Sequence, residues 1–220
     1  MKRLGQGFSE AFRLTIVLAV AVWAGMSTVA AADTIRIVAL GDSLTAGYEL
    51  PPTAAFPEQL EAALRARGYD VEIVNAGVSG DTSSAGRERL DWAVPDGTDA
   101  VIVQLGANDA LRGIDPEQTR RALGDIVERL AARDIEVLLT GMYAPPNLGE
   151  DYRAAFDSIY PELAEEHDAI LYPFFLDGVA LDPLLNLDDG MHPNAAGVEV
   201  IVERILPMVE TLIERIKAAS

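Results

Sequence analysis

The stretch TIRIVALGDSL, residues 34–44, decides the fold class of this chain because it joins a run of β-branched and aliphatic residues to a Gly-Asp-Ser turn. Further apolar runs of this kind follow along the chain, and amphipathic helical patterns separate them. Strands that alternate with helices form parallel sheets, since each helix returns the chain to the edge where the next strand begins. The sequence therefore predicts a five-stranded parallel sheet in a three-layer α/β/α sandwich. The predicted strands are residues 34–40, 71–75, 100–105, 135–140 and 169–172.

Helical patterns fill the intervals between these strands and the region after the last one. Phe56, Leu60 and Leu64 share one face of the first pattern, and Gly68 is placed to end it. Asp115 before Pro116 is typical of an N-cap followed by proline at the first helical position. We see no internal repeat or long linker, so we expect one domain. The predicted helices are residues 56–67, 83–92, 116–132, 152–166 and 194–217, the last one broken or bent near Pro207.

Composition limits the chemistry that this chain can perform. Its 220 residues suffice for one well-buried domain. Lys and Arg total 17 against 35 Asp and Glu, and the formal charge of −18 disfavours a nucleic-acid partner, which needs a basic face. The absence of cysteine excludes thiolate zinc sites, cysteine nucleophiles and disulfides. Reactive groups must therefore come from Ser, Asp, Glu, Asn or His.

Residues 1–32 have the order of a secretory signal peptide. Basic residues at Lys2, Arg3 and Arg13 precede an apolar run, and small residues precede Asp33. We expect cleavage after Ala32, a mature domain of residues 33–220, and export to the periplasm or the medium with no stable membrane anchor. An uncleaved anchor is the alternative, because residues 14–32 contain no charge over 19 positions.

Polar and small residues follow the first three predicted strands. Ligands bind outside the carboxyl ends of parallel strands, so these loops are the places where reactive side chains belong. Ser43 follows the first strand, Gly77 follows the second, and Asn108 follows the third. The N–H groups of Ser43 and Gly77 and the amide of Asn108 are three donors that can converge on one oxyanion.

A serine nucleophile needs an adjacent base, and this chain offers His167 and His192. His167 ends a predicted helix, where the helix dipole and exposure explain a histidine well. His192 lies in a loop before the last helix, three residues after Asp189. Asp189 can hold Nδ1–H of His192 and thereby present Nε2 to Ser43, which is the orienting role of a catalytic triad.

Each of these signals also has an ordinary structural interpretation. Gly-Asp-Ser-Leu can be a simple turn, Asn108 can belong to a helix cap, and Asp189 with Gly190 can form a tight turn. We assign Asn194 to capping the last helix. The order of the signals along the chain, at one edge of the predicted sheet, favours the functional interpretation.

With these residues the sequence resembles the GDSL, or SGNH, hydrolase family, whose name-giving residues are Ser43, Gly77, Asn108 and His192 here. The resemblance extends over nearly all of residues 33–220, and it is most marked to the acyl-CoA thioesterase I, lysophospholipase L1 and bacterial arylesterase branch. It implies a flavodoxin-like sandwich, Ser43 as nucleophile, and Asp189 with His192 completing the triad. It also implies an oxyanion hole made by the Ser43 N–H, the Gly77 N–H and the Asn108 side chain. Segment 144–148 diverges more, which leaves substrate preference open.

The resemblance implies hydrolysis of carboxylic esters and thioesters through an acyl-enzyme. We expect small-molecule substrates with acyl or aryl groups, no cofactor, no metal, and a monomer. An apolar groove near the loops should hold the acyl group, and the loop through Leu111 and Ile114 should adjust to it. The predicted groove residues are Leu44, Tyr48, Leu111, Ile114, Tyr143, Ala144 and Pro145.

Three alternatives stay open at this point. A secreted binding module can use the same sandwich without hydrolysis, with Ser43 and His192 in turns and caps. A glycan or peptidoglycan O-deacetylase is the second alternative, within the same family. Metal-dependent hydrolysis is the third, although the two histidines form no ligand motif. The α/β-hydrolase fold is disfavoured, because no Gly-x-Ser-x-Gly elbow is present.

Overall fold

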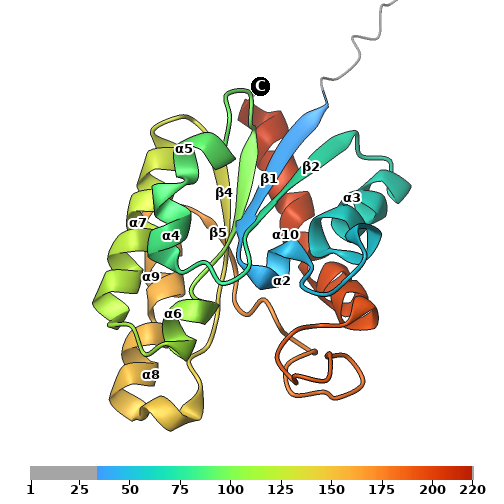
Figure 1. Cartoon of the computed structure of the whole chain (residues 1–220). Coiled ribbons are helices and arrows are strands. Elements are labelled where there is room, and N and C mark those ends of the chain that lie inside the picture. Colours follow the sequence, from blue (N-terminus) through green and yellow to red (C-terminus); the bar gives the residue numbers. More distant parts are fainter. Residues whose placement is uncertain (1–33, 220) are drawn as a thin grey trace, which may run out of the picture. The chain divides into compact units, whose positions relative to one another are not determined.

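The computed structural model of the chain describes residues 34–219, and Figure 1 shows their arrangement. The predicted leader, residues 1–32, lies outside the described residues. Within residues 34–219, no helix combines the length and the apolar character needed to cross a bilayer.

A single five-stranded parallel sheet forms the middle layer, in the order β2-β1-β3-β4-β5. This confirms the predicted sheet, and the order is that of flavodoxin-like folds. Strand β1 is paired with β2 on one side and β3 on the other, so Gly41 at its end faces Gly77 of β2 and Gln104 of β3. The strands are β1 (Ile35–Gly41), β2 (Val71–Gly77), β3 (Ala100–Gln104), β4 (Glu136–Thr140) and β5 (Ile170–Tyr172).

Burial explains why these runs form strands. Every residue of β3 is buried, as are the last five of β1, so side chains on both faces of the sheet are covered. Continuous apolar runs are typical of parallel strands that have helices on both faces. Strand β2 lies at the edge of the sheet, and only Val71 and Ile73 of its seven residues are buried.

Helices cover both faces of the sheet, which confirms the predicted sandwich. In Figure 1, α3 and α10 lie on one side of the sheet, and α4, α7 and α9 lie on the other. The long helices are α3 (Phe56–Ala66), α7 (Pro116–Ala131), α8 (Glu150–Asp157), α9 (Ile159–Glu166) and α10 (Ala195–Ala219). The short ones are α2 (Ser43–Ala46), α4 (Ser83–Glu88), α5 (Leu90–Ala93), α6 (Ala107–Leu111) and the 3₁₀ turns η1 (Pro52–Ala54) and η2 (Pro146–Leu148).

Two regions predicted as single helices are each divided in two. The helix predicted at residues 83–92 is interrupted at Arg89, which lies between α4 and α5. The helix predicted at residues 152–166 is interrupted at Ser158, between α8 and α9. Pro161 follows closely, and proline lacks the N–H that would bond the carbonyl four residues earlier, so it favours this break.

The last helix, predicted to be broken or bent near Pro207, is not broken there, because α10 continues through Pro207 and is 25 residues long. Pro207 lies on the exposed face, where the unpaired carbonyl four residues before it can bond water. The carbonyl of Pro207 itself accepts a hydrogen bond from the Thr211 hydroxyl at 2.9 Å. The opposite face buries an apolar stripe against the sheet and α3, and this packing outweighs the lost hydrogen bond.

Candidate active site

Ser43 lies at the carboxyl end of β1, as the first residue of α2. Asp42 caps this helix, because its Oδ1 accepts a hydrogen bond from the Leu44 N–H at 3.0 Å. Gly41 has no room for a side chain, since a Cβ there would collide with Thr45 and with the Gln104 carbonyl. The turn before Ser43 is therefore packed tightly between the Thr45 side chain and the end of β3.

The structure brings Ser43, His192 and Asp189 together. Nε2 of His192 lies 2.9 Å from Oγ of Ser43, although the two residues are 149 positions apart in sequence. Nδ1 of the same ring lies 2.6 Å from Oδ2 of Asp189. The imidazole is thus hydrogen-bonded through both nitrogens, to a hydroxyl on one side and to a carboxylate on the other.

Backbone donors hold the Asp189 carboxylate in place. Its Oδ1 accepts hydrogen bonds from the N–H groups of His192, at 3.0 Å, and Met191, at 2.9 Å. Gly190 has φ of +70°, a conformation that glycine adopts without strain. The backbone N–H groups of His192 and Met191, followed by the imidazole, lower the pKa of Asp189 to about 2. The carboxylate therefore stays ionised around neutral pH and can orient the imidazole.

Two asparagine amides fix the loop that contains this pair. Asn186 is buried, and its Nδ2 donates to the carbonyls of Val179 and Asp182 at 2.7 Å each. Nδ2 of Asn194 donates to the Leu184 carbonyl at 2.9 Å. Oδ1 of Asn194 accepts from the Gly197 N–H at 3.0 Å in the first turn of α10, which confirms its predicted capping role.

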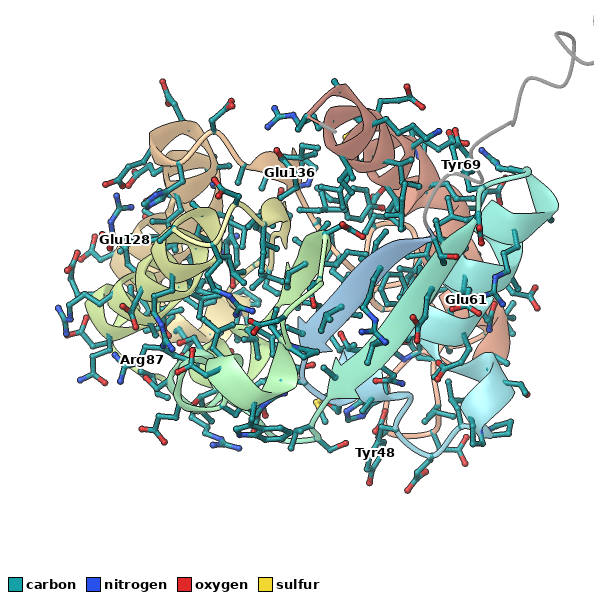
Figure 2. All side chains as sticks on the ribbon, turned by 90° about the horizontal axis from the view of Figure 1, so that it is seen from above. Tyr48, Glu61, Tyr69, Arg87, Glu128 and Glu136 are labelled. Atoms are coloured by element: carbon teal, nitrogen blue, oxygen red, sulfur yellow. The ribbon has the colours of Figure 1, made fainter. Side chains whose placement is uncertain are left out.

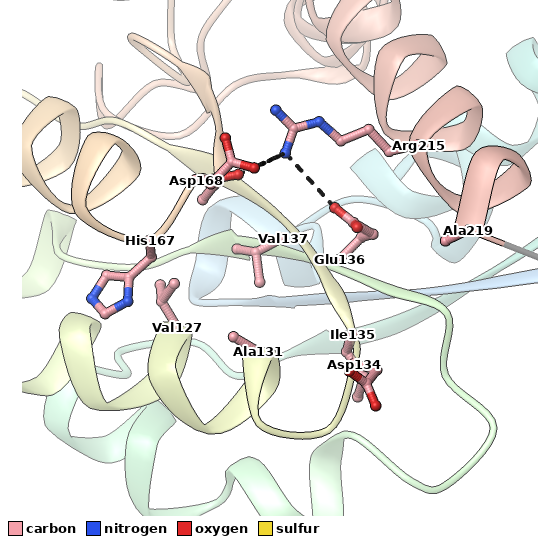
Figure 3. Close-up of a pocket in the computed structure, with 11 residues that line it drawn as sticks. Val127, Ala131, Asp134, Ile135, Glu136, Val137, His167, Asp168, Arg215 and Ala219 are labelled. Atoms are coloured by element: carbon pink, nitrogen blue, oxygen red, sulfur yellow. Dashed lines mark hydrogen bonds and ion pairs between the residues drawn. The ribbon is translucent and has the colours of Figure 1, made fainter.

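His167 lies away from this site. It ends α9, as predicted, and lines an open hollow of about 280 Å³ shown in Figure 3. In this hollow Arg215 contacts Asp168 and Glu136, and Glu136 begins β4. The hollow therefore opens at the amino end of the sheet, whereas Ser43 follows a carboxyl end.

The three predicted oxyanion donors lie at the ends of neighbouring strands. The Gly77 N–H donates to Oδ1 of Asn75 at 3.1 Å, and a Cβ at Gly77 would collide with the backbone of Ala46. Nδ2 of Asn108 donates to Oδ2 of Asp42 at 3.3 Å, which leaves its second hydrogen for another acceptor. Ser43 is the first residue of α2, so its N–H has no hydrogen-bond partner within that helix.

Asp42 is a residue whose role the sequence did not indicate. Its side chain is fully buried, and burial raises the pKa of Asp42 to about 6, although the hydrogen bonds that it accepts from the Leu44 N–H and from Nδ2 of Asn108 oppose this effect. Gln104 lies beneath it, with Oε1 accepting from the Thr45 hydroxyl at 2.8 Å. The only signal in the sequence is the position of this carboxyl directly before Ser43.

No local pattern in the sequence indicates that Arg89 and Asp81 form an ion pair. Nε of Arg89 lies 2.6 Å from Oδ2 of Asp81, and both side chains are largely buried. Nη2 of Arg89 donates to the Gly41 carbonyl at 2.9 Å, and the Val78 N–H donates to the same carbonyl at 3.0 Å. Arg89 thus links the turn that contains the serine to the loop that follows β2.

The residues predicted to hold the acyl group differ in their surroundings. Leu44 and Ala144 are buried in the core. Ile114 and Pro145 are partly buried, and Leu111 is exposed. Tyr143 is exposed and packs on Phe174, with ring centroids 4.7 Å apart. The exposed Val78 and Met191 add apolar surface in the loops that contain the site residues.

The described part of the chain has no group of three or more His, Asp or Glu side chains that could share a metal ion. The polar side chains near Ser43 include the imidazole of His192, the carboxylates of Asp189 and Asp42, and the amide of Asn108. These groups can transfer a proton from a hydroxyl and hydrogen-bond an oxyanion.

The fold is a flavodoxin-like sandwich, and a serine, an imidazole and a carboxylate are in contact at the carboxyl edge of its sheet. Together these two features place the chain in a class of α/β proteins with a hydrolase-like site. A family model described as "GDSL-like Lipase/Acylhydrolase family" matches residues 39–200, and the chain belongs to this family. The resemblance stated from the sequence is thereby confirmed.

Relatives over most of the chain are named as ester and thioester hydrolases. "Thioesterase 1/protease 1/lysophospholipase L1" of Escherichia coli (strain K12) is 40% identical over 185 residues, which cover 84% of this chain and 86% of that protein. "Arylesterase" of Vibrio mimicus is 38% identical over 169 residues, which cover 76% of this chain and 84% of that protein. These names confirm the expectation that the chain is an enzyme of the ester-hydrolase class.

Solved structures agree with this assignment. AlinE4, an SGNH-hydrolase family esterase, is 48% identical with a TM-score of 0.70, covering 82% of this chain and 97% of that one. The psychrotrophic esterase EstA from Pseudoalteromonas sp., in a structure inhibited by monoethylphosphonate, is 29% identical with a TM-score of 0.77, covering 81% of this chain and 98% of that one.

Proposed function

We propose that this chain is an exported serine esterase that hydrolyses carboxylic ester and thioester bonds through a Ser43–His192–Asp189 triad. The observation that carries the proposal is the pair of contacts of one imidazole, 2.9 Å to the Ser43 hydroxyl and 2.6 Å to the Asp189 carboxylate. A serine hydroxyl is a weak nucleophile until a base accepts its proton, and this arrangement supplies the base and orients it.

In the proposed reaction, Oγ of Ser43 attacks the substrate carbonyl while Nε2 of His192 takes the hydroxyl proton. The tetrahedral intermediate collapses as the imidazolium gives this proton to the leaving alcohol or thiol. Water then attacks the acyl-enzyme, His192 takes one water proton and returns it to Oγ, and the acid leaves. Asp189 stays ionised and stabilises the imidazolium in both steps.

The Ser43 N–H, the Gly77 N–H and the Asn108 amide are the proposed oxyanion donors. Because the Gly77 N–H is bonded to Asn75, it has to turn toward the substrate or share its hydrogen in the transition state. We expect Asn108→Ala to lower kcat about a hundred- to a thousandfold, the usual effect of removing one such donor. Steady-state assays measure this change, and a loss of kcat smaller than about tenfold would show that the two backbone donors suffice.

Esters and thioesters with acyl or aryl groups are the proposed substrates. The names of the relatives support this range, since they include a thioesterase, a lysophospholipase and an arylesterase. The apolar side chains in the loops around Ser43 support an acyl or aryl group rather than a charged one. The five predicted groove residues outside the core are Tyr48, Leu111, Ile114, Tyr143 and Pro145.

The decisive experiment is hydrolysis of p-nitrophenyl esters from acetate to palmitate by residues 33–220, with Ser43→Ala and His192→Ala alongside. We expect both variants to lose activity while their melting temperatures stay near that of the parent. Labelling by a fluorophosphonate should occur in the parent and disappear in Ser43→Ala. No activity and no labelling in the parent would favour a binding module, and activity on acetyl esters alone would favour a deacetylase.

Export is the remaining part of the proposal, and it rests on the composition of residues 1–32. Expression of the full chain in a Gram-negative host should yield a periplasmic protein that begins at Asp33. Mass spectrometry of the purified protein checks this cleavage. A protein that keeps residues 1–32 and sediments with membranes would show instead that the segment is an anchor.

A further inference from the structure

The ring of Tyr48 lies against the ring of His192. Their centroids are 4.4 Å apart and the ring planes are inclined by 34°. Aromatic rings at this separation attract each other beyond the effect of burial alone. Tyr48 is also 39% exposed, so its position is not explained by packing in the core.

Tyr48 is tied to the nucleophile through the backbone. The carbonyl of Ser43 accepts hydrogen bonds from the N–H groups of Gly47 and Tyr48, each at 3.2 Å. Gly47 ends α2 with φ of +78°, and a Cβ there would crowd Ala55. The same short helix that begins with Ser43 therefore determines where the tyrosine ring lies.

These contacts constrain His192 from three directions. Asp189 bonds Nδ1 and Ser43 bonds Nε2 of the imidazole, and hydrogen bonds to ring nitrogens favour directions in the plane of the ring. Such bonds resist rotation within the plane more than rocking out of it. The Tyr48 ring, packed against the face of the imidazole, resists this second motion.

The tyrosine ring also suits the charge that develops during the reaction. The face of an aromatic ring attracts a cation, and His192 becomes an imidazolium when it takes the serine proton. The nearby carboxylates of Glu49 and Asp189 raise the pKa of Tyr48, the former most strongly, so the phenol stays neutral at the pH of the reaction.

We propose that Tyr48 is a positioning residue for His192, holding the imidazole between Ser43 and Asp189 in addition to any contact with the acyl group. This inference rests on the proposed function. It differs from the sequence-based prediction for Tyr48, which placed this side chain only in the wall of the acyl groove.

The two roles predict different kinetics. A groove wall acts on the acyl chain, so its loss raises KM for long chains and leaves acetate esters unaffected. A positioning residue acts on the proton transfer, so its loss lowers kcat for every chain length. A positioning role that depends on the ring face is also retained by phenylalanine and lost with an aliphatic side chain.

The test compares Tyr48→Leu, Tyr48→Met and Tyr48→Phe on p-nitrophenyl acetate and p-nitrophenyl decanoate. We expect the two aliphatic variants to lower kcat about three- to tenfold on both esters, the rate equivalent of one aromatic pair. Tyr48→Phe should stay within about twofold of the parent. The rate of fluorophosphonate labelling, which needs no long acyl chain, should fall in the aliphatic variants by the same factor as kcat.

Tyr69→Leu is the matched control for the loss of a tyrosine ring. Tyr69 lies at the opposite end of the sheet, as Figure 2 shows, with Nζ of Lys217 5.0 Å from its ring centroid. Melting temperatures of all variants report their folding, and the second aliphatic variant keeps the comparison usable if one of them is unstable.

A change confined to KM for decanoate, or a Tyr48→Phe variant as slow as Tyr48→Leu, would overturn the proposal. Unchanged kcat and labelling in the aliphatic variants would do the same. Failure of the proposed function is distinguishable, because it would appear as an inactive parent or as activity that survives Ser43→Ala.

Discussion

Asp42, next to the proposed nucleophile, has a fully buried carboxyl group. It accepts hydrogen bonds from the Leu44 N–H and from Nδ2 of Asn108. These bonds only partly replace the lost hydration, and burial raises the pKa of Asp42 to about 6. The residue therefore gains a proton on folding over a pH range in which the unfolded chain releases it.

This difference has a definite sign. Below about pH 4 the Asp42 carboxyl is protonated in both states, and as the pH rises toward 6 the unfolded state ionises first. The gap between 3.8 and about 6 corresponds to about 3 kcal/mol of folding stability that is lost over this range. We expect the free energy of unfolding of Asp42→Asn, relative to the parent, to increase by about this amount between pH 4 and pH 7.

Urea unfolding at several pH values measures this difference, and it separates Asp42 from the many other carboxylates that both proteins share. A relative stability that does not change with pH would contradict the prediction.

The Asp42→Asn variant should also be a poorer enzyme. Its amide offers a donor where the carboxylate offered an acceptor, so Asn108 would turn its own oxygen toward residue 42 and away from the oxyanion.

The sequence predicted Ser43, Gly77, Asn108, Asp189 and His192 as site residues because each follows a strand or precedes a helix in a recognisable order. It could not predict the supports beneath them. Asp42 meets Gln104 and Asn108 from more than 60 positions away, and Arg89 meets the Gly41 carbonyl from 48 positions away. Such pairs leave no local pattern, since they depend on the register of the finished sheet.

At the scale of elements, the break between α4 and α5 places the Arg89 guanidinium under the turn that contains Ser43. Helical periodicity over residues 83–92 predicted one helix, because neither proline nor glycine marks the break at Arg89. The five strands were predicted to within two residues at each end, because a buried parallel strand appears as an apolar run. Tertiary contacts, rather than local preference, decide where α4 ends.

Arg89→Met should be strongly destabilising. It removes one partner of a buried ion pair and leaves Asp81 charged with little access to water, which typically costs about 3 to 5 kcal/mol. Arg87→Met, two positions earlier in the last turn of α4, is the control, since Arg87 is more exposed and its nitrogen lies 3.9 Å from Asp125. We expect that variant to lose less than about 1 kcal/mol in urea unfolding. Equal losses in both variants would show that Arg89 contributes only as a surface charge.

At the scale of the whole molecule, the formal charge of −18 sets the electrostatic potential around the site. Glu49 lies six positions after Ser43, and Asp188 and Asp189 lie within four positions of His192. This potential does not slow the approach of a neutral substrate to the site. An anionic substrate is repelled, and salt reduces the repulsion.

We therefore expect kcat/KM for a sulfonated phenyl acetate to rise severalfold between about 10 mM and 200 mM NaCl, a range in which the screening length falls from about 30 Å to below 10 Å. Phenyl acetate, which has no charge, serves as the control and should change by less than about twofold. Parallel responses of the two esters would show that salt acts on the enzyme rather than on the approach of the substrate.

The 149 positions between Ser43 and His192 have a consequence for how the protein is made. A ribosome that has completed β1 and the serine turn has not yet translated the imidazole. A chain terminated prematurely before residue 192 therefore contains the hydroxyl but no base to activate it. If the proposed triad operates, esterase activity appears only when synthesis and closure of the final loop are complete, and it can report the yield of finished molecules directly.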